Sequence, residues 1–188
     1  MKNNLIASYD QIAEKYDSLF DNQADKSIEF NLMYKLNIWQ YDSVLDVGCG
    51  TGALLDYFTC SDYLGIDPSI KMLERFEVKH PGHNAIQLKF ESLVTTKKYS
   101  FVLALFGSFS YINPKELIRV QAMLEPNGQA FIMVYKQGYT PATYVKTGIS
   151  VSHYSEAAYM KVVNIMHNAS VEYFDNYLII RLSHENFH

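Results

Sequence analysis

The stretch that decides the fold is Val44-Leu45-Asp46-Val47-Gly48-Cys49-Gly50-Thr51-Gly52. Its first residues form a short apolar run typical of a buried strand, and three glycines at alternate positions end that run. Residues 53–58 then favour a helix, so the stretch predicts a strand, a glycine loop and a helix. Glycines let a backbone come close to a ligand at a helix N-terminus. Because ligands of open parallel sheets bind beyond the carboxyl ends of the strands, this loop is the predicted binding site.

Strands and helices alternate along the rest of the chain. The apolar patterns predict further strands at residues 63–66, 85–90, 99–105, 129–135, 170–174 and 177–183. They predict helices at residues 4–20, 28–39, 68–76, 113–124 and 155–167. This alternation predicts an α/β fold with a doubly wound, mostly parallel seven-stranded sheet whose final strand is antiparallel.

The length of the chain predicts its number of domains, and its net charge bears on whether it binds nucleic acid. A chain of 188 residues predicts one domain, which we divide into an N-terminal helical region (1–40), a core (43–135) and a C-terminal region (136–188). The 16 basic and 20 acidic residues give a net charge of −4, without the basic excess of proteins that bind phosphate backbones. Nucleic acid is therefore not an expected partner.

The cysteines and the hydropathy of the sequence bear on metal binding, cellular compartment and membrane association. Cys49 and Cys60 form neither a disulfide framework nor a metal-binding spacing, so we expect no metal and a reducing, cytoplasmic environment. The longest apolar run, residues 101–112, is shorter than the roughly 20 residues that span a membrane, so no membrane partner is expected. The sequence carries no signal for an oligomeric state.

Asp46 indicates the charge of the ligand. It lies at the end of the first predicted strand, immediately before the glycine loop. A carboxylate there would repel a pyrophosphate and would attract an ammonium or a sulfonium group. The predicted ligand therefore carries a positive charge.

At these residues the chain resembles the class I S-adenosylmethionine-dependent methyltransferases, whose first motif is similar to the D-V-G-C-G-T-G of residues 46–52. The similarity continues through L-G-I-D-P-S at 64–69 with Met72, and through L-E-P-N-G-Q at 124–129, and covers roughly residues 9–135. It implies a Rossmann-like fold and S-adenosylmethionine as cofactor, with Asp67 holding the two ribose hydroxyls. It implies an EC 2.1.1-type transferase that methylates an N, O or C atom of a small molecule.

The resemblance also implies the residues of the cofactor site. They come from the N-terminal segment, the glycine loop and the ends of the second to fourth strands: Tyr9, Tyr16, Asp46, Gly48, Cys49, Gly50, Asp67, Pro68, Met72, Phe90, Glu91 and Leu105.

The sequence departs from the family's pattern at Lys89, at Ser100, which takes a position that is usually acidic, and at the end of the fourth strand. Lys89 stands where the family often has an aspartate for the adenine amino group. Glu91 can replace that acid and Phe90 can flank the adenine ring, or both are ordinary edge residues. The fourth strand ends in L-F-G-S at 105–108, without the Asn/Asp-Pro-Pro-aromatic signature of relatives that methylate nucleic-acid bases or glutamine. The absence of this signature makes nucleic-acid bases and glutamine less favoured as methyl acceptors.

Candidate catalytic residues are Tyr16 and His153. The segment around Tyr9 and Tyr16 resembles the lid helix of small-molecule methyltransferases, although an amphipathic helix explains the pattern equally well. His153 lies in the long connection after the fifth strand, where a neutral imidazole can accept a proton near pH 7, or where it is an ordinary surface histidine. The other connections are short, which favours a small-molecule acceptor.

Two other functions remain open. Gly48-x-Gly50-x-x-Ala53 with Asp67 about 20 residues on also satisfies the pattern of NAD(P)-dependent oxidoreductases, although Asp46 and the position of Gly52 favour the methyl donor. A non-catalytic scaffold or partner subunit would keep the sheet but lose the cofactor, and the lysine at position 89 keeps that alternative open.

Overall fold

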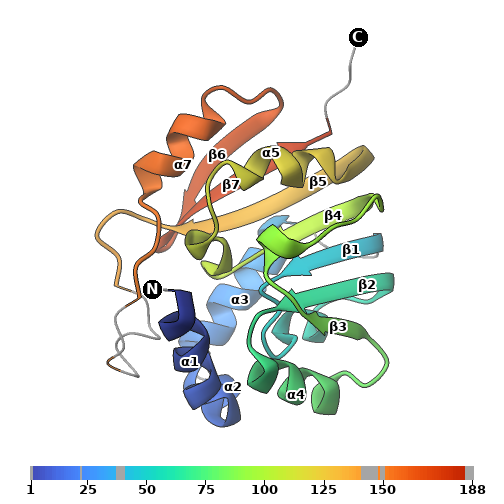
Figure 1. The fold of residues 1–188 in the computed structure, drawn as a ribbon, viewed down its shortest axis with the longest axis vertical. Helices are drawn as coiled ribbons and strands as arrows, with labels where there is room; N and C mark the ends of the chain where they lie inside the picture. The colour runs from blue at the N-terminus through green and yellow to red at the C-terminus, as the bar shows by residue number, and fades with distance from the viewer. Residues whose placement is uncertain (1, 22, 37–40, 141–147, 149–150, 185–188) are drawn as a thin grey trace.

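The computed structural model describes residues 2–21, 23–36, 41–140, 148 and 151–184. These residues form a seven-stranded sheet in the order β3-β2-β1-β4-β5-β7-β6 (Figure 1). The strands are β1 (Tyr41–Val47), β2 (Cys60–Asp67), β3 (Asn84–Gln87), β4 (Tyr99–Ala104), β5 (Leu124–Tyr135), β6 (Ala169–Phe174) and β7 (Tyr177–Ser183).

The pairing of the strands matches the predicted sheet. Strand β1 pairs in parallel with β2 and β4, β2 pairs in parallel with β3, and β4 pairs in parallel with β5. Strand β7 lies antiparallel between β5 and β6. The predicted mostly parallel sheet with an antiparallel final strand is therefore confirmed. The order reverses between β1 and β4, which is where a doubly wound sheet opens a crevice at its carboxyl edge.

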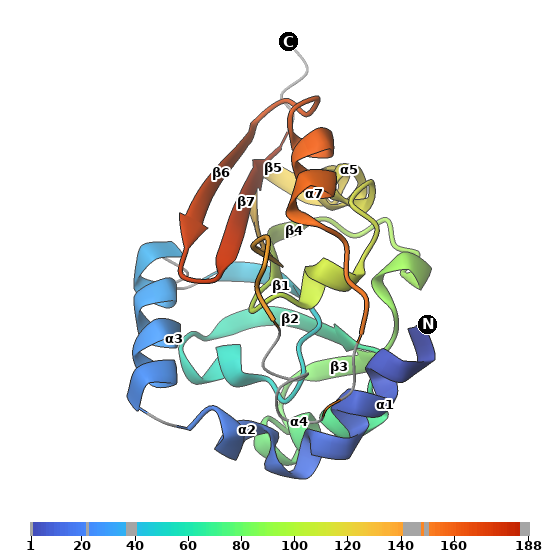
Figure 2. The same cartoon turned by 90° about the vertical axis from the view of Figure 1, so that its left-hand side faces the viewer.

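Helices cover both faces of the sheet (Figure 2). They are α1 (Lys2–Ile12), α2 (Tyr16–Leu19), α3 (Gln23–Leu36), α4 (Ile70–Lys79), α5 (Glu116–Ala122) and α7 (Glu156–Val163), with 3-10 turns η1 (Ala13–Lys15), η2 (Ala53–Asp56), η3 (Phe90–Ser92) and η4 (Ser108–Tyr111). Among these residues no helix is long and apolar enough to cross a membrane.

Strand β4 shows how the two faces are filled. Val102 packs in one apolar cluster with residues of α5 and α7, whereas its neighbour Leu103 packs in a second cluster with residues of α3 and α4. Successive side chains of a strand point to opposite faces, so a strand covered on both sides must be apolar throughout. This explains why β4 shows no alternation in the sequence.

Some predicted boundaries were wrong. The helix expected at residues 53–58 is the short turn η2, because the connection from β1 to β2 has only the roughly dozen residues that a parallel crossover needs. The expected strand 85–90 stops at Gln87, because its partner β2 ends at Asp67. The first predicted helix is divided into α1, η1 and α2.

The later helices differ mainly in length. Helix α5 ends at Ala122 rather than at residue 124, because Leu124 already pairs with Tyr99 in the sheet. Helix α7 is shorter at both ends than the expected 155–167. Helix α3 begins five residues before the expected residue 28, and residues 37–39 of that prediction lie outside the described residues.

Candidate cofactor and acceptor site

The glycine loop after β1 takes a conformation that needs glycine. Gly48 and Gly50 have φ values of +76° and +56°, in the left-handed region that other residues rarely adopt. A Cβ at Gly48 would lie 2.5 Å from Cβ of Ser108, whereas a Cβ at Gly50 would have no atom of the described residues within 4 Å. The loop is therefore pressed against the turn after β4 on one side and open on the other.

Asp67 ends β2 and holds the glycine loop. Its Oδ1 accepts a hydrogen bond from the backbone N–H of Ser69 at 2.8 Å, and its Oδ2 accepts one from the N–H of Gly50 at 3.1 Å. A carboxylate offers about four acceptor positions, so two remain for a ligand. Burial raises the pKa of Asp67 to about 6, although the two backbone donors lower it. The arrangement suits a pair of neighbouring hydroxyls, such as those of a ribose.

Asp46, at the end of β1, is more deeply buried than Asp67, with 2% of its surface exposed. The Tyr63 hydroxyl donates a hydrogen bond to its Oδ2 at 2.8 Å. Burial raises the pKa of Asp46 to about 7, against the lowering effect of that hydrogen bond, and the nearby Asp67 raises it further. A cation beside this carboxyl would favour its charged form, so the group fits the positively charged ligand expected from the sequence.

A central cavity of about 130 Å³ lies over the glycine loop and the ends of β1, β2 and β4. Ten of the twelve predicted cofactor residues line it: Tyr9, Tyr16, Asp46, Gly48, Cys49, Gly50, Asp67, Pro68, Met72 and Leu105. The structure thus brings together residues that lie far apart in the sequence. Thr51, Ser69, Ser108 and Tyr111 also line it and were not predicted.

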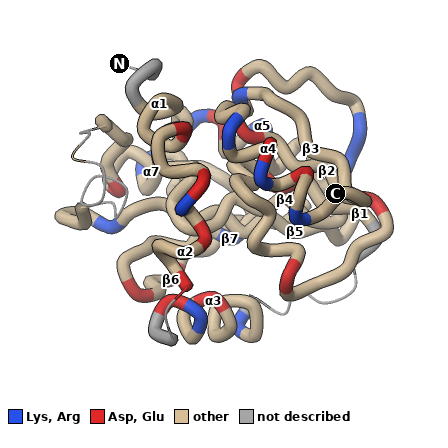
Figure 3. The backbone as a smooth tube through the Cα atoms, turned by 90° about the horizontal axis from the view of Figure 1, so that it is seen from below, with Lys and Arg blue, Asp and Glu red and all other residues tan. Residues whose placement is uncertain are grey.

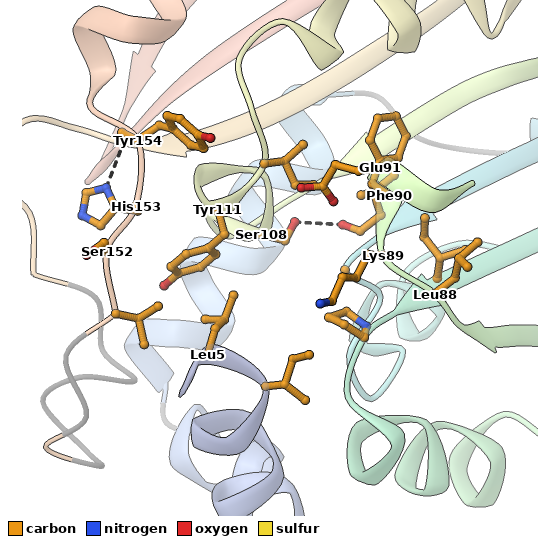
Figure 4. Close-up of a pocket in the computed structure, with 17 residues that line it drawn as sticks. Leu5, Leu88, Lys89, Phe90, Glu91, Ser108, Tyr111, Ser152, His153 and Tyr154 are labelled. Carbon is orange, nitrogen blue, oxygen red and sulfur yellow. Dashed lines mark hydrogen bonds between the residues drawn. The ribbon is translucent and has the colours of Figure 1, made fainter. Parts of the chain in front are cut away.

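The remaining two predicted residues, Phe90 and Glu91, line a β3-side cavity of about 290 Å³ (Figure 4). This cavity adjoins the central one, since both are lined by Gly48, Pro68 and Ser108. The Phe90 ring is 2% exposed and lies 4.4 Å from the guanidinium carbon of Arg119, so the side chain is held in place. The two cavities form one elongated crevice along the carboxyl edge of the sheet.

The N-terminal helices are tied to the loops that form the crevice. The Ser69 hydroxyl donates to Oδ1 of Asp10 in α1 at 2.5 Å, and the Thr51 hydroxyl donates to Oδ1 of Asp17 in α2 at 2.6 Å. Tyr9 and Tyr16 both line the central cavity, with ring centroids 6.3 Å apart. The helical segment that resembled a lid therefore does lie over the predicted site.

An α3-side cavity of about 240 Å³ lies beyond these tyrosines and is lined by Tyr9, Tyr16, Ala53 and Phe106 in common with the central cavity. Its other walls combine aromatic rings with charged side chains: Asp17, Phe20, Asp25, Lys26, Glu29, Lys79, Tyr135, Tyr139, Asp175 and Tyr177. Figure 3 shows acidic positions on both α2 and α3. Four carboxylates against two ammonium groups make this wall negative.

The aromatic wall depends on a glycine in the turn after β4. The rings of Tyr135, Tyr139 and Tyr177 pack with centroid separations of 5.2 to 5.9 Å. Gly107 has a φ of +85°, and a Cβ there would lie 2.2 Å from Cε1 of Tyr135. Only a glycine leaves room for this ring. Burial raises the pKa of the Tyr135 and Tyr177 hydroxyls, which keeps both neutral.

The two candidate catalytic residues lie in different surroundings. Tyr16 lines both the central and the α3-side cavity, and burial together with the carboxylates of Asp67 and Asp17 raises the pKa of its hydroxyl. It is therefore a neutral phenol rather than a base at physiological pH. His153 lines the β3-side cavity, and its ring lies edge-on to Tyr135 at 5.3 Å.

The hydrogen bond of His153 fixes its tautomer. Its Nδ1 lies 3.0 Å from the carbonyl oxygen of Tyr154. Because a carbonyl only accepts, Nδ1 carries the hydrogen and the Nε2 lone pair of the neutral ring stays available to accept a proton. Within the parts of the chain that the structure covers, no group of three or more metal-ligating side chains is placed to hold a metal ion.

Residues of the α3-side cavity are the main ones that sequence reasoning missed. Asp25 and Glu29 lie on a helix, and Tyr139 and Tyr177 follow or begin separate strands, so they share no local motif. The one available signal was the number of tyrosines, 15 in the whole chain, but most buried aromatic residues simply pack in cores.

Two curated proteins are similar in sequence. An uncharacterized protein of Methanocaldococcus jannaschii is 29% identical over 123 residues, which are 64% of this chain and 47% of that protein. The dTDP-3-amino-3,4,6-trideoxy-alpha-D-glucopyranose N,N-dimethyltransferase of Streptomyces venezuelae is 29% identical over 115 residues, which are 57% of this chain and 47% of that enzyme. The chain therefore spans about half the length of these relatives.

A solved structure and a family model cover more of the chain. The structure, described as a DhpI-SAM-HEP complex, superposes with a TM-score of 0.70 at 13% identity and covers 96% of both chains, which shows a shared fold. The family model of a methyltransferase domain matches residues 7–176. Because that match covers most of the chain, including the glycine loop, Asp67 and the strands β1 to β6, the chain belongs to the methyltransferase-domain family.

Proposed function

We propose that this chain transfers a methyl group from S-adenosylmethionine to an amino group of a small molecule, such as an amino sugar. The observation that carries the proposal is the carboxylate of Asp67, which accepts hydrogen bonds from the backbone amides of Gly50 in the glycine loop and of Ser69 just before α4, with two acceptor positions left at the cavity wall. Membership of the methyltransferase-domain family and the named activity of the Streptomyces relative support it.

Different residues of the chain would bind different parts of the cofactor. Asp67 would accept the ribose hydroxyls, and the open backbone at Gly50 would face the cofactor's amino-acid part. Asp46 would meet its positive charge, while Tyr9 and Tyr16 cover it from the N-terminal helices. When bound, the cofactor supplies an electrophilic methyl group on a sulfonium.

The acceptor would enter from the α3-side cavity. Its wall shared with the central cavity, at Tyr9, Tyr16 and Phe106, is where the two ligands can meet. Aromatic faces and carboxylates both attract an ammonium group, so this cavity favours an amine over an alcohol. A small acceptor also agrees with the size of the cavity, about 240 Å³.

An ammonium group must lose a proton before its nitrogen attacks. In the transfer, the new N–C bond forms as the C–S bond breaks, and the proton leaves to a base or to water. His153 is our candidate for that base, since its Nε2 is available and its ring lies against Tyr135 of the acceptor wall. Tyr16 is our candidate for positioning the nitrogen, as a neutral phenol between the two cavities.

Ligand-induced thermal shifts separate this proposal from its alternatives. We expect S-adenosylhomocysteine to raise the melting temperature of the protein and the reduced nicotinamide dinucleotide to leave it unchanged. Stabilisation by the dinucleotide would instead favour an oxidoreductase, and stabilisation by neither would favour a non-catalytic scaffold.

The acceptor is tested by methyl transfer. We expect label from S-adenosylmethionine to enter primary or secondary amines, amino sugars included, and not the matching alcohols. Label found only on oxygen would contradict the amine, and a His153→Gln variant with unchanged turnover from pH 6 to 9 would exclude His153 as the base.

A further inference from the structure

Aromatic rings make up much of the wall of the α3-side cavity. Seven of the sixteen residues that line it are tyrosine or phenylalanine. One group of rings comes from the N-terminal segment, where Tyr16 and Phe20 have ring centroids 5.1 Å apart. The other comes from β5, β7 and the turn after β4, where the Phe106 ring lies edge-on to Tyr177 at 6.5 Å. Several aromatic rings around one cavity are the arrangement that binds methylated ammonium groups.

The tyrosine hydroxyls around β5 form hydrogen bonds with one another. Tyr139 and Tyr177 share a hydrogen bond, which contributes to the raised pKa of Tyr177. The hydroxyl of Tyr111 donates to that of Tyr135 at 3.5 Å. Because these hydroxyls already have partners, the tyrosines offer a ligand ring surface more than hydrogen-bond acceptors.

Three of the four carboxylates of this wall also accept hydrogen bonds from within the protein. The Thr51 hydroxyl donates to Asp17 at 2.6 Å, the Tyr57 hydroxyl donates to Glu29 at 2.6 Å, and the side-chain amide of Asn176 donates to Asp175 at 2.9 Å. Their charge remains, and four carboxylates outnumber the two lysines of the cavity. The wall thus attracts a cation while part of its hydrogen-bonding capacity is already used.

The number of N–H groups on an ammonium decides how well it suits such a wall. A primary ammonium loses hydrogen bonds to water when it enters a cavity, and it needs new acceptors for three hydrogens. Each methyl group replaces one of these hydrogens and leaves the positive charge in place. The attraction to carboxylates and to ring faces then remains, while the cost of removing water falls. Affinity should therefore rise as methyl groups are added.

Methyl transfer itself produces this kind of group. The nitrogen lone pair forms the new N–C bond, the C–S bond breaks with its electron pair going to sulfur, and the positive charge passes from sulfur to nitrogen. A tertiary amine still has a lone pair for one more transfer, once its ammonium form has lost its proton to a base or to water. The product of that transfer is a quaternary ammonium, whose charge is permanent.

We infer that the α3-side cavity is a site for methylated ammonium groups, so that this enzyme methylates one nitrogen repeatedly, up to the quaternary ammonium. The inference rests on the proposed function, because it places the acceptor in the same cavity. It goes further in naming the degree of methylation. A wall of carboxylates without hydrogen-bond partners would instead bind a primary ammonium best, since each added methyl group removes an N–H that such carboxylates accept.

Binding of a matched series of amines tests the site. The probes are ethanolamine, N,N-dimethylethanolamine, choline and 3,3-dimethylbutan-1-ol, which has the shape of choline without its charge. In calorimetry with protein saturated with S-adenosylhomocysteine, we expect choline to bind at least about tenfold more tightly than ethanolamine and than the neutral alcohol. The dimethylated amine should lie between. Choline that binds no more tightly than either reference compound, or that does not bind, would overturn the inference.

Product analysis tests the reaction and separates the two proposals. Mass spectrometry should show a third methyl group on the dimethylated form of an amine that takes up label from S-adenosylmethionine. Primary amines that take up label but stop at two methyl groups would overturn the inference and leave the proposed function intact. If no amine takes up label, the proposed function itself fails and the inference fails with it.

Substitutions of Tyr139 test the part played by the rings. This residue is half-buried in the turn after β5, whereas Tyr135 is too deeply buried to be replaced safely. We expect Tyr139→Leu to weaken choline several-fold and ethanolamine clearly less, and Tyr139→Phe, which keeps the ring, to retain most of the affinity for choline. Tyr34→Leu, at an exposed position of α3, is the control. Equal affinities for choline in Tyr139→Leu and Tyr139→Phe would contradict an aromatic site.

Discussion

At the scale of single residues, the proposed binding of a nucleoside depends on Asp67. Its carboxylate connects β2, the glycine loop and the start of α4 through two backbone hydrogen bonds. We expect Asp67→Asn to raise the dissociation constant of S-adenosylhomocysteine at least tenfold, or about 1.4 kcal/mol, since hydrogen bonds to ionised groups contribute about 1.5 to 3 kcal/mol. Calorimetry measures the change, with surface-exposed Asp62→Asn as control. An unchanged constant would refute the ribose assignment.

Asp46 predicts a specific dependence on pH. Its pKa of about 7 lies above the value of about 3.9 for an unfolded aspartate. Between these two values the folded protein binds more protons than the unfolded chain, so the contribution of Asp46 to the free energy of unfolding falls as pH rises. We therefore expect Asp46→Asn to gain stability relative to the unmodified protein from pH 5 to pH 8 in urea titrations.

Binding of S-adenosylhomocysteine should have the opposite dependence on pH. The ammonium of the cofactor's amino-acid part is the cation that S-adenosylhomocysteine keeps, since its sulfur is uncharged. If Asp46 meets this ammonium, the carboxylate must be charged, so the stabilisation by S-adenosylhomocysteine should grow from pH 5.5 to pH 8 in the unmodified protein and much less in Asp46→Asn. A ligand-induced shift in melting temperature with the same pH profile in both proteins would show that Asp46 does not meet the positive charge.

At the scale of elements, the turn after β4 requires a glycine at position 107 for two reasons, its positive φ and the lack of space for a Cβ atom. Gly107 and Gly138 have similar φ values, +85° and +83°, but only a Cβ at Gly107 would contact another side chain, at 2.2 Å from Tyr135. We expect Gly138→Ala to lower the free energy of unfolding by about 1 to 2 kcal/mol through backbone strain alone. Gly107→Ala should cost at least about 1 kcal/mol more, measured by urea denaturation. Equal losses would mean that the Tyr135 ring moves aside freely.

Polar contacts join the helices α1 and α2 to the core: the hydrogen bonds from Ser69 to Asp10 and from Thr51 to Asp17, and an ion pair of Asp17 with Lys79 at 3.6 Å. Thr51→Val keeps the size of the side chain and removes the hydrogen bond to Asp17. We expect faster amide exchange in α1 and α2, unchanged exchange in the sheet, and faster dissociation of S-adenosylhomocysteine in stopped-flow experiments. Ser18→Ala, which removes a hydrogen bond within the helical segment itself, is the matched control. Equal dissociation rates in both variants would contradict the role of the Thr51 contact.

The elements also show what the sequence can predict. The glycine loop and Asp67 are local signals, because the residues that fix their geometry lie next to one another in the chain, and all twelve predicted cofactor residues line the crevice. The contact between Asp10 and Ser69 joins residues 59 positions apart and leaves no pattern in the sequence. The length of a helix in a short crossover is likewise set by the two strands it joins, which is why the expected helix at 53–58 was wrong.

At the scale of the whole molecule, charge is distributed unevenly around the crevice. Among the residues that the structure describes, the walls of the α3-side cavity combine four carboxylates with two ammonium groups, whereas those of the β3-side cavity carry one of each, Glu91 and Lys89. No sequence motif predicts this difference in charge between the two cavities, because the carboxylates come from α2, α3 and the turn between β6 and β7. It arises only when the sheet brings these elements to one edge.

This distribution predicts how an amine acceptor responds to charge. We expect Asp25→Asn to raise the KM for an amine acceptor several-fold with a smaller change in kcat, because the substitution removes one negative charge from the acceptor wall. Added salt should raise the KM of the unmodified enzyme in the same direction. Glu77→Gln, an exposed position on α4, is the control, and equal KM values in the two variants would contradict a charged acceptor wall.

The two contacts that hold α1 and α2, from Ser69 to Asp10 and from Thr51 to Asp17, also bear on the timing of catalysis. Both join these helices to the loops proposed to hold the nucleoside, so we expect release of the spent cofactor to require their separation. Under the proposed function, each turnover would then include an opening event whose frequency depends on these contacts and not on the reactivity of the acceptor. Substrates of very different nucleophilicity would then share one maximal turnover number.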